Sequence, residues 1–71
     1  MLTLHPAVAG ILQFFESAHL PEKLREVSEP FGLLATRLAT TLPSNAELTV
    51  SLRKLLEAKD AAVRAAIWKQ T

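Results

Sequence analysis

Basic side chains in the last third of the chain are the residues best suited to binding chemistry. From Ser51 onward five basic residues stand against two acidic ones, whereas the first fifty residues carry three basic and five acidic ones. The formal net charge of +1 is too small for strong binding to a long nucleic-acid backbone. We therefore expect any site for a compact anion to draw on the C-terminal third, with Arg64 and Lys69 as its cations.

Lys59 lies among small side chains in the same region. It falls within an apolar helical row, and the simpler interpretation is a lysine whose stem lies on the core while its ammonium group reaches water. A helix this rich in alanine is thin, which suits close packing against another copy but also leaves room for a flat ligand around Lys59 and Arg64. Both interpretations stay open at this stage. The alanines are Ala58, Ala61, Ala62, Ala65 and Ala66.

Three aromatic side chains offer flat surfaces: Trp68 and the pair Phe14 and Phe15. Such residues commonly anchor a core or an interface, and they also serve as stacking platforms for nucleobases. The sequence alone leaves both roles possible.

Catalytic and cofactor chemistry is not expected. The chain has no cysteine, and its two histidines, His5 and His19, flank the first expected helix and cannot share one helical face as a metal pair. Ser17 and Ser28 are the serines nearest His19, but no glycine-lined turn or orienting carboxylate marks either as a nucleophile. We predict a non-enzyme with no metal and no cofactor.

Membrane and DNA partners are also disfavoured. No basic residue precedes Lys23, so the first expected helix lacks the basic face of a membrane-surface helix, and no signal or transit peptide is expected. The basic residues near the C-terminus are spaced along a long helix and interrupted by acids, unlike a compact recognition helix.

The periodicity of apolar residues predicts three helices, at about residues 6–18, 22–42 and 45–69. Pro6 suits a first helical turn, and Pro21 and Pro43 mark the two breaks. The second row keeps its phase across Pro30, which favours one long helix, with a kink or tight junction at Pro30, over a clean break. Its members are Leu24, Val27, Phe31, Leu34, Ala35, Leu38 and Leu42.

Local signals complete the expected fold. Ser44 and Glu47 have the spacing of a capping box at the start of the last helix, and Arg53 with Glu57 and Asp60 with Arg64 stand four residues apart as possible ion pairs. The short connection at Pro43 predicts an antiparallel hairpin with the first helix laid across it. The fold class is all-α, one domain over residues 1–71. Because 49% of so short a chain is hydrophobic, we expect a homo-oligomer.

The order of these motifs resembles a known family. The segment from Phe15 to Pro21, the apolar row of the second helix, Pro43 with Glu47, and the closing stretch over residues 52–65 are together similar to the phage anti-CBASS cyclic-nucleotide sponges, whose helical-hairpin domain is shared with anti-Thoeris sponges. The resemblance covers about two-thirds of the chain. It implies an all-α protein that assembles as a symmetric oligomer, often a hexamer, in the cytoplasm of an infected bacterial host. It also implies sequestration, without cleavage, of cyclic di- or trinucleotide immune signals.

The resemblance also suggests site residues. Where relatives have a tyrosine this chain has Ser17, so stacking would fall to Phe14, Phe15 or His19. A family basic residue aligns near Ser28, with Arg25 one turn earlier as its substitute. The family's C-terminal arginine aligns near Trp68 or Lys69, with Arg64 one turn before.

Two functional hypotheses follow. The first is a sponge with ligand-binding residues Phe15, His19, Arg25, Ser28, Lys59, Arg64, Trp68 and Lys69. The second is a small homo-oligomeric protein-interaction module with no small ligand, in which Arg64 merely pairs with Asp60 on an exposed face.

Overall fold

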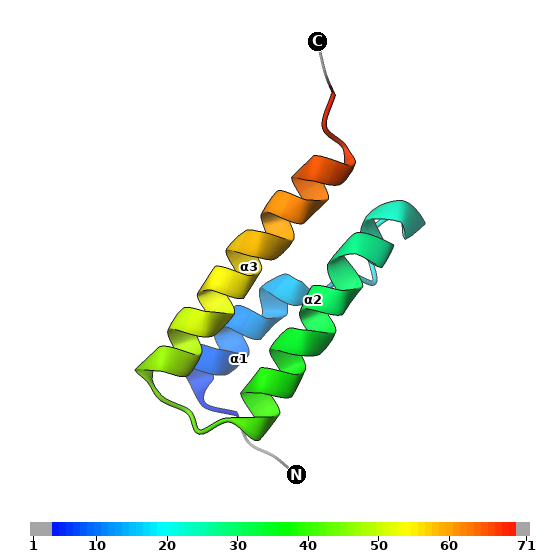
Figure 1. The fold of residues 1–71 in the computed structure, drawn as a ribbon. Coiled ribbons are helices and arrows are strands. Elements are labelled where there is room, and N and C mark those ends of the chain that lie inside the picture. The colour runs from blue at the N-terminus through cyan, green and yellow to red at the C-terminus, as the bar shows by residue number, and fades with distance from the viewer. Residues whose placement is uncertain (1–3, 70–71) are drawn as a thin grey trace.

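The computed structural model describes residues 4–69 and is built from helices (Figure 1). Helix α1 (Pro6–Leu12) continues into the 3₁₀ helix η1 (Gln13–Phe15), and the long helices α2 (Glu22–Thr41) and α3 (Ala46–Ala66) follow. α2 and α3 pack side by side in opposite directions, and α1 lies across the half of this hairpin nearest the α2–α3 connection. The described residues contain no strand, which confirms the prediction of an all-α fold with a helical hairpin.

The first helical segment is shorter than predicted. The ring nitrogen Nδ1 of His5 accepts a hydrogen bond from the amide of Ala7 at 3.1 Å and caps α1, but the α conformation ends at Leu12 and helical structure ends at Phe15. The side-chain amide of Gln13 donates to the carbonyl of Gly10 at 2.8 Å, which satisfies a carbonyl near the helix end. Apolar spacing of three residues fits a 3₁₀ turn as well as an α-helix, so the pattern does not show where one replaces the other.

α2 continues through Pro30 as one helix rather than breaking there. Its buried residues are small: Ser28, Ala35 and Ala39. Of the large side chains expected to face the core, Phe31 and Leu38 pack against it, but Leu34 and Leu42 are 44% and 46% exposed. The expected apolar row therefore describes α2 only in part.

A close approach by the preceding segment explains why α2 buries small residues. A Cβ added to Gly32 would lie 3.2 Å from the carbonyl oxygen of Phe15, so the η1 backbone rests almost directly on α2. Only small side chains fit beneath a backbone at this separation. Gly10, by contrast, has no neighbour within 4 Å of such a Cβ, so no close packing requires a glycine there.

The last helix begins one residue later than predicted and uses a different cap. The Asn45 side chain accepts from the amide of Leu48 at 2.9 Å, so the Ser44 capping box is wrong. With Asn45 as the cap, Glu47 stands at the second helical position instead of the third, where a capping-box carboxylate is required. At the other end the helix stops at Ala66, because Ile67 and Trp68 are 57% and 73% exposed and pack against too little to hold another turn.

The ion pairs along α3 also differ from those expected. Within residues 4–69 the two ion pairs are Lys54–Glu57, at 3.5 Å on the exposed side, and Lys59–Asp60, at 2.8 Å. The expected pairs of Arg53 with Glu57 and of Asp60 with Arg64 are absent from this part of the chain. Each carboxylate instead pairs with a lysine. Among residues 4–69 no helix is both long enough and apolar enough to span a bilayer.

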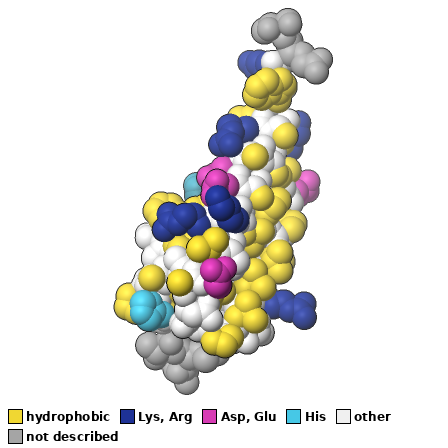
Figure 2. Space-filling model, turned by 60° about the vertical axis from the view of Figure 1, so that its left-hand side comes forward, with side chains coloured by type: hydrophobic (Ala, Val, Ile, Leu, Met, Phe, Trp, Pro, Cys, Tyr) yellow, Lys and Arg dark blue, Asp and Glu magenta, His cyan; other side chains and the backbone are white. Residues whose placement is uncertain are grey.

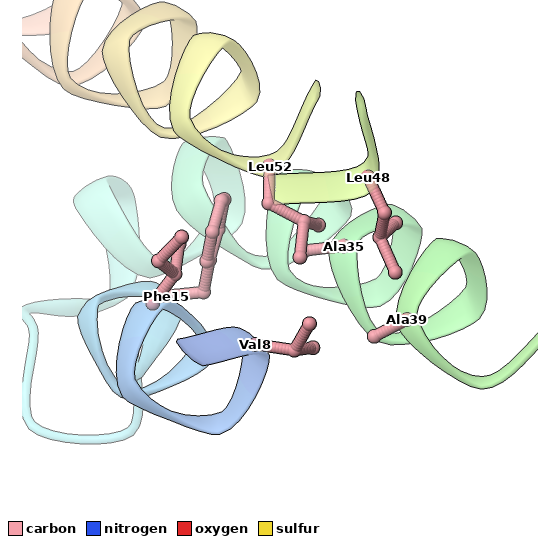
Figure 3. Close-up of a cluster of buried hydrophobic side chains, with 7 residues drawn as sticks. Val8, Phe15, Ala35, Ala39, Leu48 and Leu52 are labelled. Atoms are coloured by element: carbon pink, nitrogen blue, oxygen red, sulfur yellow. The ribbon is translucent and has the colours of Figure 1, made fainter. Parts of the chain in front are cut away.

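The core is small and lies in the half of the hairpin nearest its connection. Figure 3 shows side chains from α1 and η1 inserted between α2 and α3, with Leu52 and Ala35 fully buried at the centre. Half-buried leucines and Phe31 surround this cluster. The buried hydrophobic residues are Val8, Ile11, Phe15, Ala35, Ala39, Leu48 and Leu52.

Candidate functional site

A groove lies on the other half of the molecule, between the segment after α1 and the later turns of α3. Its volume is about 400 Å³, which is within the range of small-molecule sites. The η1 side contributes Gln13, Phe14, Glu16, His19 and Leu20, and α3 contributes Lys59, Asp60, Val63 and Arg64. The four α3 residues fall one turn apart in two adjacent pairs, so helical geometry alone places them on one face.

The α3 wall carries a cation that is held in place. The Lys59 side chain is only 13% exposed, and its ammonium nitrogen lies 2.8 Å from a carboxylate oxygen of Asp60, whose own side chain is 47% exposed. The interpretation of a stem packed on the protein is therefore correct for Lys59, and its ammonium group is nevertheless part of the groove lining. Arg64, five residues after Lys59, has no carboxylate partner among residues 4–69 and is exposed.

The opposite wall supplies flat and polar groups. Phe14 is 59% exposed and presents an aromatic ring to the groove, and the His19 ring is exposed in the turn that follows η1. Gln13 is fixed by its bond to the Gly10 carbonyl. An aromatic ring facing cations across a groove is an arrangement that can stack a base while the cations meet a phosphate.

The charges that line the groove balance. Lys59 and Arg64 are opposed by Asp60 and Glu16, so one chain does not provide the positively charged surface expected from the composition of the C-terminal third. Figure 2 shows acidic and basic side chains intermingled along the upper part of this view rather than separated into patches. The groove is therefore suited to a ligand that carries hydrogen-bond donors as well as negative charge.

The structure brings together His19, Lys59 and Arg64 of the eight residues predicted to bind a ligand. Phe15 and Ser28 are 5% and 0% exposed, because both lie where η1 and α2 meet, and neither offers surface to a ligand in this conformation. Arg25 is half-buried on α2 and lines none of the hollows described here. The structure therefore does not bring Phe15, Arg25 and Ser28 together with His19 at the groove of one chain.

Trp68 and Lys69 lie just past the end of α3, on a shallow surface that they share with Arg64 and Ile67. Arg64 thus belongs both to this surface and to the groove. The two surfaces are adjacent along α3, and an arginine between them can reach toward either.

The groove contains polar residues that sequence reasoning did not select. Asp60 was considered only as a partner of Arg64, and Glu16 and Gln13 not at all. The spacing of residues 59, 60, 63 and 64 on one helical face was a usable signal for Asp60. Glu16 had none, because its position depends on where η1 ends. Among residues 4–69 no three His, Asp or Glu side chains gather as a metal site.

Large apolar side chains are also exposed outside the groove. Leu33 is 66% exposed beside η1, and Val50 is 47% exposed, in addition to Leu34 and Leu42. Figure 2 shows hydrophobic side chains forming a band along one side of the molecule. Bands of this kind commonly mark surfaces that bind another protein.

The comparisons with known proteins give no further guidance: no family model, no curated protein and no solved structure matches this chain.

Proposed function

We propose that this protein binds cyclic di- or trinucleotides without cleaving them, and so sequesters immune signals of a bacterial host in the manner of a phage anti-CBASS sponge. The observation that carries the proposal is the groove in which Lys59 and Arg64 face Phe14 and His19. Two cations in the lining of one groove suit a phosphate, and an exposed aromatic ring suits a base. The resemblance of the helical-hairpin motifs supplies the ligand class.

Binding without turnover is supported by the groove's composition. The described lining holds no serine, threonine or cysteine that could attack a phosphodiester, and His19 is its one imidazole. A ligand held by an ammonium, a guanidinium and a ring stack is bound at several points but meets no nucleophile.

Assembly into a symmetric homo-oligomer, with a hexamer favoured by the resemblance, is part of the proposal. The exposed Leu33, Leu34, Leu42 and Val50 provide apolar area that association would cover. Repetition of Arg64, Trp68 and Lys69 around an axis would present several cations to the phosphates of one ring. The cations of several subunits would then supply the excess positive charge that the groove of a single chain lacks. The oligomer would act in the cytoplasm of the infected cell.

Calorimetry against a panel of cyclic di- and trinucleotides, repeated on Arg64→Ala, tests the proposal. We expect binding to at least one ligand, weakened by roughly tenfold or more in the variant because a charge-assisted hydrogen bond is lost. Ligand recovered after denaturation should be intact. Silence across the panel refutes the sponge, and recovery of linear products refutes binding without turnover.

The alternative is a homo-oligomeric protein-interaction module with no small ligand, which the exposed apolar band favours. It predicts that the same panel gives no heat and that Leu34→Glu abolishes partner binding. The sponge predicts instead that groove and band variants both lose ligand.

A further inference from the structure

Asp60 occupies a position that phosphate binding alone does not explain. Its carboxylate lies in the groove beside the two cations that would meet a phosphate, and Glu16 adds a second carboxylate from the opposite wall. A carboxylate repels a phosphate, so a groove selected only for anions would be expected to lack one. The Lys59 ammonium pairs with Asp60, and the acceptor positions that this pair leaves open suit a ligand that donates hydrogen bonds.

The carboxylate is also held ready to accept such bonds. Oδ1 of Asp60 lies 2.8 Å from the Lys59 ammonium, whose stem is mostly buried, so the pair is anchored to a rigid helix. An ionised carboxylate has about four acceptor positions on its two oxygens, and Lys59 uses one. With 47% of its side chain exposed, Asp60 keeps acceptor positions open toward the groove.

The bases of a cyclic nucleotide differ in how well they match this acceptor. Guanine presents two neighbouring donors on its pairing edge, the ring N1–H and the exocyclic N2 amino group, which match the two oxygens of a carboxylate. Adenine presents one amino donor beside the acceptor N1, which a carboxylate repels. Single-stranded or unpaired bases are commonly read by hydrogen bonds on this edge.

We infer that Asp60 is a specificity-determining residue that selects guanine-containing rings, accepting from N1–H and N2–H while Arg64 binds a phosphate. The inference rests on the proposed function and assigns its ligand. Phe14 and His19 supply the surfaces on which the base stacks. Lys59 acts as a positioning residue for the carboxylate as well as a cation of the site.

Calorimetry with cyclic di-GMP and cyclic di-AMP on the wild type, Asp60→Asn and Glu57→Gln tests the inference. Glu57→Gln is the matched control, since it removes the same charge from the same helix at an exposed position paired with Lys54 outside the groove. We expect the wild type to prefer cyclic di-GMP. Asp60→Asn should lower that preference by roughly tenfold or more, the size typical of a two-point base contact, and Glu57→Gln should leave it unchanged.

Three outcomes overturn the inference. If Asp60→Asn strengthens both ligands by the same factor, the carboxylate merely repels phosphate. If the preference is the same in Asp60→Asn as in the wild type, Asp60 does not read the base. If the wild type binds both ligands equally, the proposed function stands and the inference fails; binding of neither removes both.

A comparison on the ligand side needs no variant and covers the case in which Asp60→Asn does not fold. Cyclic di-IMP lacks only the N2 amino group of cyclic di-GMP. We expect the wild type to bind it more weakly, by roughly fivefold or more for one lost hydrogen bond to a charged group. Equal affinity for the two rings contradicts the inference.

Discussion

The two halves of the hairpin differ in what their residues do. Near the connection, α1 and η1 fill the space between the long helices and bury Ala35, Leu48 and Leu52 almost completely. Toward the other end, Val63 is half-buried, and the space beside α3 is a groove lined by charges. The N-terminal segment is too short to cover the whole hairpin. Stability is thus concentrated in one half, which leaves the other half free to carry binding groups.

Truncation of a core leucine in the packed half should lower the stability of the protein more than any other change considered below. We expect Leu52→Ala to lower the free energy of unfolding by about 2–5 kcal/mol, because Leu52 is fully buried. Val63 is only half-buried, so Val63→Ala should lower the free energy of unfolding by about 1 kcal/mol. Urea denaturation followed by circular dichroism at one protein concentration measures both. Equal losses would mean that the two halves are equally important to stability.

Removal of a helix cap tests the start of α3 at the end of the packed half. Asn45→Ala should lower the free energy of unfolding by about 1 kcal/mol, because the Leu48 amide loses its acceptor. Ser44→Ala is the control and should change the midpoint of urea unfolding very little. A larger loss of stability in Ser44→Ala than in Asn45→Ala would instead support the Ser44 capping box predicted from the sequence.

Two glycine substitutions test how closely the chain packs in that half. Gly10→Ala should raise stability by about 0.5–1 kcal/mol, since alanine favours a helix and nothing lies near the new Cβ. Gly32→Ala has the same helical advantage but meets the Phe15 carbonyl oxygen at 3.2 Å. Thermal unfolding should therefore place Gly32→Ala below Gly10→Ala. A Gly32 variant at least as stable would show that η1 can move away from α2.

The smallest effect on stability is expected in the groove. Lys59→Met keeps an apolar stem and removes the ammonium group, so the free energy of unfolding should change by less than about 1 kcal/mol. Binding of any cyclic nucleotide should weaken markedly in the same variant. A large loss of stability would mean that the Lys59–Asp60 pair holds the fold together and that the two halves are not separate in function.

Much of the fold was predictable because its signals are local. The prolines at 6, 21 and 43 and the spacing of Leu48, Leu52 and Leu55 place three helices and their connections without reference to tertiary structure. The switch to a 3₁₀ turn at Gln13 was not predictable, since both helix types satisfy the same apolar spacing. Nor was the choice of Asn45 over Ser44, because both side chains are good caps.

The face that α2 buries depends on how closely the η1 backbone approaches Gly32, and this tertiary distance cannot be predicted from the apolar pattern of α2. Hydrophobicity favoured Leu34 and Leu42 as core residues along with Ala35. The η1 backbone lies so close to Gly32 that small residues face inward: Ala35 is buried as expected, but Ser28 and Ala39 are buried with it and the two leucines are exposed. For the same reason Ser28 is buried, which the sequence did not indicate. Charge and the alanine-rich surroundings did single out Lys59 and Arg64, which both line the groove.

The position of Trp68 has a practical consequence for spectroscopy. It is the one tryptophan of a chain that has no tyrosine, and its indole is 73% exposed beyond the end of α3. Its emission in an isolated chain should therefore already resemble that of an indole in water, and denaturant should shift its maximum very little. A blue shift that grows with protein concentration would instead report that the indole has entered an apolar contact between copies. The intrinsic fluorescence of this protein is thus a poor probe of unfolding and a direct probe of self-association.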